Sequence, residues 1–240
     1  MTEGGLRAVI WDMDGVIADT ASYHEQAWRM TFKKRGVAFS SEDFRRTFGQ
    51  RNDTIIPDIM GKHLSEDEIE AIGDEKEADY RRRIGQSIKP LPGVVELMEG
   101  LSSAGFRQAL VSSAPMESIR LILGSLGIEK YFQSILSGED VAEGKPNPQG
   151  YLVAANRLGV VPENCIVIED AVAGVAGAKR GGMRCLAVTN THPRSGLQEA
   201  DLIVDSLEEV TVAGLIRLLD NPEGQNQHQE ESGGSQWRGL

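Results

Sequence analysis

The chain contains 240 residues, of which 40% are hydrophobic and 25% are charged, and this composition excludes a wholly disordered protein. The 25 Lys and Arg residues and the 36 Asp and Glu residues give a net charge of −11 without a basic block, which argues against nucleic-acid and anionic-membrane partners. No apolar run approaches the ~18 residues of a membrane helix, and the N-terminus lacks the basic region that begins a secretion signal.

The first predicted element is a strand at Leu6–Trp11, and a long helical region follows it. Helical patterns run over Ala21–Arg35, Ser41–Phe48 and Ser65–Ile84, with no strand among them. The region ends at the sequence KPLPG, whose prolines and glycine interrupt regular structure. We therefore predict an all-helical cap domain at residues 20–88, inserted after the first strand and hinged at both ends.

From residue 89 onward, apolar runs alternate with helix-like segments. The runs are rich in Val, Ile and Leu without regular polar alternation, which is typical of strands covered on both faces. They lie at Gln108–Ser112, Ser134–Leu136, Cys165–Ile168, Arg184–Val188 and Leu202–Val204. The helix-like segments are Gly93–Ser103, Pro115–Leu126, Pro148–Leu158, Ala171–Arg180 and Leu207–Leu219. This order predicts the α/β class, with a doubly wound, parallel, Rossmann-like sheet built from residues 1–19 and 89–220.

Two further predictions concern the tail and the cysteines. Residues 221–240 are polar and predict a disordered tail. Cys165 and Cys185 each open an apolar run, which fits buried strand thiols better than a disulfide framework, and neither lies in a C-x-x-C motif. We therefore expect a reduced, cytoplasmic protein. We also expect a monomer, although no residue pattern determines the oligomeric state.

Chemically reactive side chains follow four of the predicted strands. Ligands bind outside the carboxyl ends of strands in open α/β sheets, so we expect these side chains to meet at one edge. They are Asp12 and Asp14, then Ser112 and Ser113, then Lys145, and finally Glu169 and Asp170. Four carboxylates repel one another unless a cation lies among them, which implies a divalent metal, and all-oxygen ligands favour Mg²⁺ over zinc. A metal, a lysine and a hydroxyl together form a receptor for a phosphoryl group.

Each of these residues has a simpler interpretation when it is taken alone. Asp-x-Asp-Gly sequences are common in turns, and Ser112 can cap the helix that opens at Pro115. Lys145 can be a solvated loop residue, and Glu169 and Asp170 can stabilise the start of the next helix. Their occurrence in order after four successive strands favours a shared site.

The ordered motifs resemble those of the haloacid dehalogenase superfamily, over Leu6 to Leu219. The matching motifs are Asp12–Ile17, Ser112, Lys145–Pro146 and Glu169–Asp170. The helical insertion is similar to the cap of the subgroup that contains β-phosphoglucomutase and small sugar-phosphate phosphatases, and Asp19–Trp28 is particularly like β-phosphoglucomutase. The resemblance implies phosphoryl transfer on a small phosphorylated metabolite, with Mg²⁺ as the cofactor.

The resemblance also implies a role for each motif residue. Asp12 would be the nucleophile that forms an aspartyl-phosphate, and Asp14 would be the general acid and base. Ser112, Ser113 and Lys145 would bind the phosphoryl oxygens.

A second set of implied roles concerns the metal. Mg²⁺ would be held by the carboxylates of Asp12 and Asp170 and by the Asp14 carbonyl, with Glu169 as a further ligand or directly behind them. Mg²⁺ and Lys145 would let the anionic nucleophile approach an anionic phosphate. One opposite charge at ~4 Å is worth about 4 kcal/mol at an effective dielectric of 20, before desolvation.

Four residues of the helical insertion are candidate substrate or cap residues. His24 and Trp28 lie four apart on one helix, so core packing is the simpler interpretation, and the functional one places His24 near Asp14. Arg51 can grip a second phosphate or form a surface ion pair, and Lys76 lies in a dense run of charges. His192 is interpreted as an ordinary loop residue.

One departure from β-phosphoglucomutase decides between two activities. Ser112 and Ser113 are followed by Ala114-Pro115-Met116, which offers few hydrogen-bond donors for the second phosphate that a mutase must hold. We therefore favour a phosphatase of sugar or polyol phosphates over a mutase. A haloacid dehalogenase would need no Asp14, and a non-catalytic binding module would be expected to lack a charged motif position.

Overall fold

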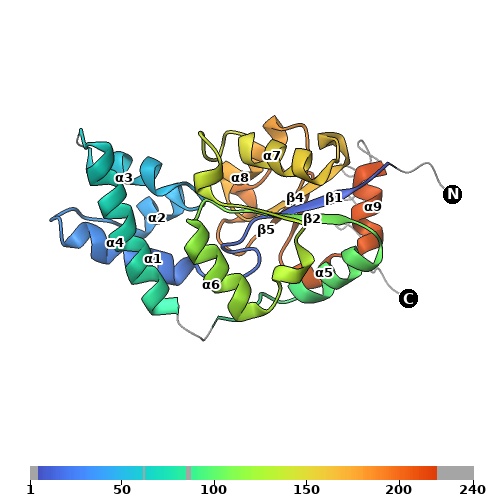
Figure 1. Cartoon of the computed structure of the whole chain (residues 1–240), viewed down its shortest axis with the longest axis horizontal. Helices are drawn as coiled ribbons and strands as arrows, with labels where there is room; N and C mark the ends of the chain where they lie inside the picture. The colour runs from blue at the N-terminus through green and yellow to red at the C-terminus, as the bar shows by residue number, and fades with distance from the viewer. Residues whose placement is uncertain (1–4, 62, 85–87, 221–240) are drawn as a thin grey trace, which may run out of the picture.

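A six-stranded parallel sheet forms the centre of the part of the chain that the structure describes (Figure 1). This computed structural model describes residues 5–61, 63–84 and 88–220, so the predicted tail lies outside the described residues. The strands are β1 (Ala8–Trp11), β2 (Arg107–Val111), β3 (Ser134–Leu136), β4 (Cys165–Glu169), β5 (Arg184–Val188) and β6 (Leu202–Val204). Their order in the sheet is β3-β2-β1-β4-β5-β6, and every pairing is parallel.

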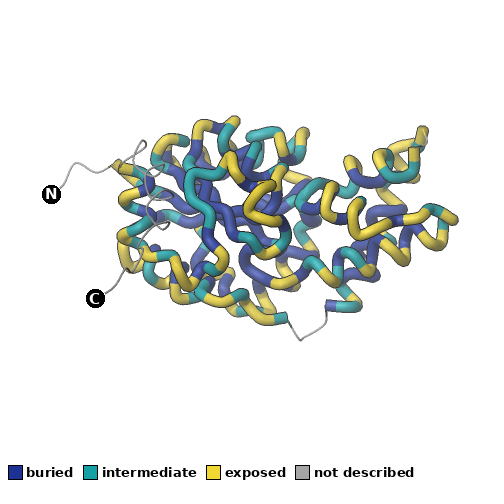
Figure 2. Tube along the Cα trace, turned by 180° about the vertical axis from the view of Figure 1, so that it is seen from behind, coloured by how far each residue is buried: buried dark blue, intermediate teal, exposed yellow. Residues whose placement is uncertain are grey.

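Helices cover both faces of the sheet, which confirms the predicted fold class. One face carries α5 (Val94–Ser103), α6 (Met116–Leu126) and α9 (Val212–Asp220), and the other carries α7 (Gln149–Leu158) and α8 (Val172–Arg180). Successive residues of a strand point to opposite faces. Accordingly, Val9 and Trp11 belong to the apolar cluster beneath α5, α6 and α9, whereas Ala8 and Ile10 belong to the cluster beneath α7 and α8. Figure 2 shows the resulting band of buried backbone through the sheet.

The predicted helix Leu207–Leu219 is wrong in its extent. A short 3₁₀ turn at Leu207–Glu209 comes first, and α9 begins only at Val212. Two capping residues explain the division. The Ser206 side chain accepts from the Glu208 N–H at 3.2 Å, and the Thr211 side chain accepts from the Gly214 N–H at 3.1 Å. Each cap starts a helical segment of its own.

Four helices form a separate group beyond the end of the sheet (Figure 1). They are α1 (Ala21–Lys33), α2 (Ser41–Thr47), α3 (Asn52–Met60) and α4 (Glu66–Ile84). Their shared apolar cluster is built around Trp28, Phe32, Phe39, Phe44, Phe48, Ile55, Ile56 and Ile72. Helix α3 was missing from the sequence prediction because Pro57, which lacks an N–H and normally interrupts helices, stands in its middle.

Two neighbouring segments connect this helical group to the sheet. Ala18 forms an antiparallel bridge with Pro90, and the Leu91 N–H donates to the Ile17 carbonyl at 2.8 Å. The chain therefore leaves and re-enters the sheet region at adjacent points, as an inserted unit would. The domain limits at residues 20 and 88 stay a prediction. No helix in the described ranges combines the length and apolarity that crossing a bilayer requires.

Candidate active site

Three buried carboxylates meet at one edge of the sheet. Asp12 follows β1, while Glu169 ends β4 and Asp170 comes next. Because β1 and β4 pair in parallel, their carboxyl ends coincide, and the Asp12 N–H donates to the Ile168 carbonyl at 3.0 Å. One carboxylate oxygen from each acid lies within 4.8 Å of the others. We refer to Asp12, Glu169 and Asp170 as the acidic cluster.

Lys145 reaches the acidic cluster from the loop between β3 and α7. Its ammonium donates to Asp12 Oδ1 and, at 2.5 Å, to Glu169 Oε1. The Tyr151 hydroxyl also donates to Glu169 Oε1, at 2.7 Å. Burial alone would lower the pKa of Lys145, but Asp12 and Glu169 raise it above its usual range, so the ammonium stays charged.

The acidic cluster carries more negative charge than Lys145 balances. Burial, followed by the neighbouring Glu169, raises the pKa of Asp170 well above its usual range. Burial raises the pKa of Asp12 as well, although Lys145 opposes the change. Asp170 Oδ2 accepts from the Thr191 hydroxyl, whereas Asp170 Oδ1 is buried without a hydrogen-bond partner among the described residues. An unpaired buried oxygen in an all-carboxylate cluster is what a divalent cation would complete.

Two glycines make this close approach of backbone and carboxylates possible. Gly15 has φ of 79°, and a Cβ there would collide with the Asp170 carboxylate and would lie 2.6 Å from Thr191 Oγ1. A Cβ on Gly174 would overlap the Glu169 carboxylate. The glycine of the Asp-x-Asp-Gly motif therefore has a steric reason as well as a conformational one.

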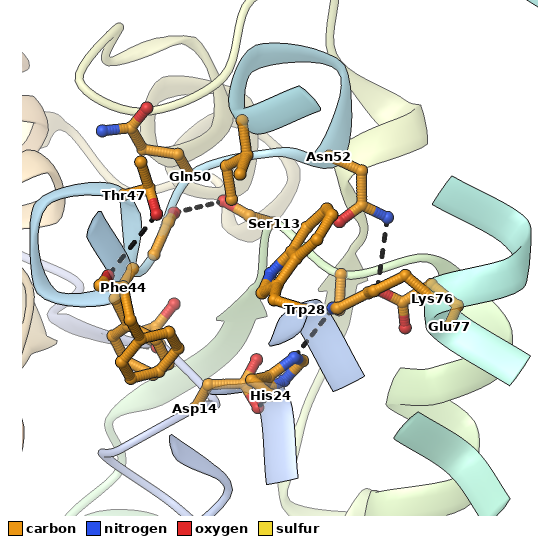
Figure 3. Close-up of a pocket in the computed structure, with 15 residues that line it drawn as sticks. Asp14, His24, Trp28, Phe44, Thr47, Gln50, Asn52, Lys76, Glu77 and Ser113 are labelled. Carbon is orange, nitrogen blue, oxygen red and sulfur yellow. Dashed lines mark hydrogen bonds and ion pairs between the residues drawn. The ribbon is translucent and has the colours of Figure 1, made fainter. Parts of the chain in front are cut away.

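Asp14 lies beside His24 of the helical group (Figure 3). Among the described residues, every hydrogen bond to its carboxylate falls on Oδ1: Thr20 Oγ1 donates at 2.6 Å, His24 Nε2 lies at 3.1 Å, and Tyr80 Oη lies at 3.5 Å. Burial would raise the pKa of Asp14, but His24, Thr20 and Lys76 together lower it. The other oxygen, Oδ2, is thus left for chemistry.

His24 is held from behind by a buried ion pair on α4. Lys76 Nζ lies 2.8 Å from His24 Nδ1 and 2.6 Å from Glu77 Oε1, and all three residues are buried. The Tyr80 ring stacks on the His24 ring, with centroids 3.8 Å apart. We refer to His24, Lys76 and Glu77 as the cap network. Trp28 packs on Phe32 in the apolar cluster and also lines the pocket that contains Asp14. Its position therefore fits both core packing and a place beside the substrate.

The two serines after β2 face different partners. The Ser112 hydroxyl is buried near Lys145 and accepts from the Ala114 N–H at 3.1 Å, and it does not cap α6, whose N-terminal cap is Pro115. The Ser113 hydroxyl donates to the Gly49 carbonyl of the helical group at 2.7 Å. Ser113 therefore contacts the cap side directly, and its phosphate-binding role stays a prediction.

Arg51 lies between the helical group and the sheet side without reaching the acidic cluster. Its guanidinium pairs with the Asp53 carboxylate and donates to the Val141 carbonyl at 2.6 Å. Its aliphatic part lies over two glycines: a Cβ on Gly144 would come within 2.6 Å of Arg51 Cδ, and one on Gly138 within 3.5 Å of Cγ. Arg51 thus forms an ion pair in this structure and at the same time bridges the two regions.

Sequence reasoning overlooked several residues of the site. Tyr80 follows Lys76 by four residues and Glu77 by three, so helical spacing was a usable signal for Tyr80 but not for the adjacent pair of Lys76 and Glu77. His192 is buried, with its ring nitrogens 3.0 Å from the Asp170 carbonyl oxygen and 2.8 Å from the Arg45 carbonyl oxygen. No pattern in the sequence indicates that contact, because residues 45, 170 and 192 meet only in the folded chain.

Comparisons with known proteins give a family and several relatives of this chain. A family model of haloacid dehalogenase-like hydrolases matches residues 6–182. The chloroplastic 5-amino-6-(5-phospho-D-ribitylamino)uracil phosphatase of Arabidopsis thaliana is 30% identical over 221 residues, which cover 90% of this chain but only 58% of that protein. A phosphorylated carbohydrates phosphatase of Thermotoga maritima is 34% identical over 178 residues, covering 74% of this chain and 82% of the relative. The crystal structure of β-phosphoglucomutase from Clostridium difficile superposes with a TM-score of 0.82 at 29% identity, covering 90% of this chain and 97% of the other.

Proposed function

Because this chain belongs to the family of haloacid dehalogenase-like hydrolases, we propose that it is a Mg²⁺-dependent phosphatase of small sugar or polyol monophosphates. The family membership confirms the resemblance predicted from the motifs. The observation that carries the proposal is that Asp12, which belongs to the acidic cluster and contacts Lys145, lines the same pocket as Asp14. A candidate nucleophile, Asp12, and a candidate general acid, Asp14, thus line one pocket.

In the first step, an Asp12 carboxylate oxygen attacks the phosphorus atom of the ester. The bond from phosphorus to the ester oxygen breaks, and that oxygen takes a proton from Asp14 as the alcohol leaves. The product is an aspartyl-phosphate on Asp12. Lys145, which contacts Asp12 in this structure, balances charge on the phosphoryl oxygens, and the nearby Ser112 hydroxyl donates to them.

In the second step, a water molecule attacks the same phosphorus atom. Asp14 takes the proton of the water, the bond from phosphorus to Asp12 breaks, and inorganic phosphate departs. The lowered pKa of Asp14 keeps it ionised, which is the form that accepts this proton. In the first step, the incoming phosphate anion beside Asp14 favours the protonated form, because like charges raise the pKa of a carboxyl group.

The acidic cluster fits Mg²⁺ by its chemistry. The carboxylates of Asp12 and Asp170 and the Asp14 carbonyl would hold the ion, with Glu169 beside them and already bonded to Lys145. When bound, Mg²⁺ supplies positive charge that stabilises the phosphoryl oxygens during transfer. Asp170 Oδ1, which is buried and has no hydrogen-bond partner in the described part of the chain, supports this assignment.

Hydrolysis is favoured over mutase chemistry by the surroundings of α6. A mutase must bind a second phosphate, and the chain leading into α6 offers Ala114, Pro115 and, as the first residue of the helix, Met116 in place of donor side chains. The Met116 N–H at the start of α6 faces a carboxylate oxygen of Glu139 at 3.4 Å, so an acid already stands where a second anion would approach. Arg51 is paired with Asp53.

A phosphate-release screen across hexose, hexitol and pentitol monophosphates tests the proposal. We expect Mg²⁺-dependent release of inorganic phosphate from several of them. The same preparation is assayed for conversion of β-glucose 1-phosphate to glucose 6-phosphate, with a bisphosphate primer. Stoichiometric conversion that releases almost no phosphate would establish the mutase, an alternative that the similarity to β-phosphoglucomutase favours.

A further inference from the structure

Glu77 is a buried carboxylate that contacts no atom of the proposed reaction, although it lines the same pocket (Figure 3). Its Oε1 accepts from Lys76 Nζ at 2.6 Å and from Asn52 Nδ2 at 3.2 Å. Its Oε2 accepts from the Ser118 hydroxyl at 2.8 Å. Both oxygens are therefore occupied by protein donors, which argues against direct substrate binding and leaves the purpose of the carboxylate to be explained.

The hydrogen-bond chemistry of the cap network has a fixed direction. An ammonium donates and cannot accept, so Lys76 must donate to His24 Nδ1. Nδ1 then uses its lone pair, the proton of the neutral imidazole is on Nε2, and Nε2–H donates to Asp14 Oδ1. The position of the Lys76 ammonium thus determines which His24 tautomer faces Asp14.

Glu77 holds that ammonium in place. Lys76 is 2% exposed, and a buried ammonium without a counterion is strongly unfavourable. The Trp28 and Tyr80 rings, 5.0 and 5.3 Å from Lys76 Nζ, add weaker cation–π attraction. The Glu77 carboxylate, by contrast, carries a full negative charge and contacts Lys76 directly, so it is the counterion of the ammonium.

The same carboxylate connects the helical group to the sheet side. Glu77 and Lys76 belong to α4 and Asn52 to α3, whereas Ser118 is a buried residue of α6, which packs on the sheet. Arg81, one turn further along α4, donates to the Ser118 hydroxyl at 3.3 Å. The bond from Ser118 to Glu77 therefore exists only while α4 is seated against α6.

We propose that Glu77 is a positioning residue that couples the seating of the helical group on α6 to the alignment of Asp14. With Ser118 and Glu77 bonded, Lys76 donates to His24, and His24 holds Asp14 Oδ1 so that Oδ2 faces the ester oxygen. Without Glu77, Lys76 loses its counterion, and its ammonium is no longer held in position to donate to His24 Nδ1. This inference rests on the proposed acid–base role of Asp14.

The test separates the step that needs Asp14 from the one that does not. p-Nitrophenolate is a good leaving group, so its release from p-nitrophenyl phosphate, with enzyme in excess over substrate, reports attack by Asp12 without help from an acid. Steady-state turnover of the best aliphatic monophosphate of the panel needs Asp14 in both steps. In Glu77→Gln, which keeps the side-chain shape, we expect p-nitrophenolate release within about threefold of wild type, while kcat for the aliphatic ester falls at least about tenfold with KM little changed.

Two further variants keep the result interpretable. Ser118→Ala removes the partner on α6 and is expected to lower the aliphatic kcat in the same selective way, by about threefold. Glu75→Ala removes a carboxylate of α4 whose ion pairs, among the described residues, are with Lys34 and Arg35 of the helical group, and it is the control expected to leave both rates unchanged. Equal losses of both rates in Glu77→Gln and Ser118→Ala, or no loss in either, would overturn the proposal. A wild-type protein that releases no p-nitrophenolate would instead contradict the proposed function itself.

Discussion

The two sides of the pocket differ in how completely their charges are balanced. On the sheet side, the acidic cluster shares one ammonium, that of Lys145, and a buried oxygen of Asp170 has no hydrogen-bond partner among the described residues. On the cap side, the carboxylates of Asp14 and Glu77 are each bonded to several donors. The sheet side thus carries an excess of negative charge that a cation would balance, whereas most of the cap-side carboxylate oxygens are already bonded to protein donors.

The difference extends to the two aspartates of the Asp-x-Asp motif. Burial raises the pKa of Asp12 despite Lys145, while His24, Thr20 and Lys76 outweigh burial and lower the pKa of Asp14. Two carboxylates only two residues apart therefore have opposite environments, because their side chains face different regions of the fold. Pairs of this kind are suited to separate chemical roles.

The largest effect is expected from removing the nucleophile on the sheet side. Asp12→Asn should lower kcat at least about a hundredfold, because an amide cannot form the covalent intermediate. The variant should melt no lower than wild type without Mg²⁺, because it removes one charge from an over-negative cluster. Steady-state phosphate release and thermal melts measure the two effects. Residual activity above about a hundredth of wild type would indicate a different mechanism.

The stabilisation of the folded protein by Mg²⁺ tests the excess negative charge of the acidic cluster directly. At a Mg²⁺ concentration a hundred times Kd, binding stabilises the folded state by about 2.7 kcal/mol, which corresponds to a rise in Tm of about 5–10 °C. We expect this rise for wild type and for Glu77→Gln, whose change is on the cap side, but not for Asp170→Asn. Equal rises in all three proteins would show that Mg²⁺ binds outside the acidic cluster.

Arg51 lies between the two sides and should have a smaller effect. Since its guanidinium pairs with Asp53 and the Val141 carbonyl, Arg51→Ala should raise KM by about tenfold at most and change kcat by less than about twofold. Steady-state kinetics on the best monophosphate measure both values, with Arg51→Lys as the matched control. A tenfold loss of kcat would show that Arg51 acts on the transition state.

The smallest effect concerns the interior of the sheet. Burial raises the pKa of Cys165 to about 12 and also raises that of Cys185, so both thiols stay protonated at pH 8 and should resist alkylation. Mass spectrometry after iodoacetamide treatment should find no modified cysteine in the native protein and two in urea. Rapid labelling of the native protein would show that the sheet opens more readily than its packing indicates.

The sequence alone was sufficient for the strands and for the groups at their ends. Continuous Val, Ile and Leu runs identify strands buried on both faces, Asp12 and Asp170 directly follow strands, and Lys145 lies in the loop between β3 and α7. Local capping was harder to judge, so the division at Thr211 and the helix through Pro57 were missed. The roles of the site residues stay predictions that the experiments above can test.

Tertiary structure alone decided which partners each side chain has. Nothing in the sequence indicates that Glu77 contacts Ser118, that His192 contacts the Asp170 carbonyl, or that Arg51 lies over two glycines. Periodicity reports which face of an element is apolar, and it carries no information about which distant polar group will face it. Those contacts depend on how helices from separate segments pack together, and the charge balance of the two sides of the pocket depends on those contacts.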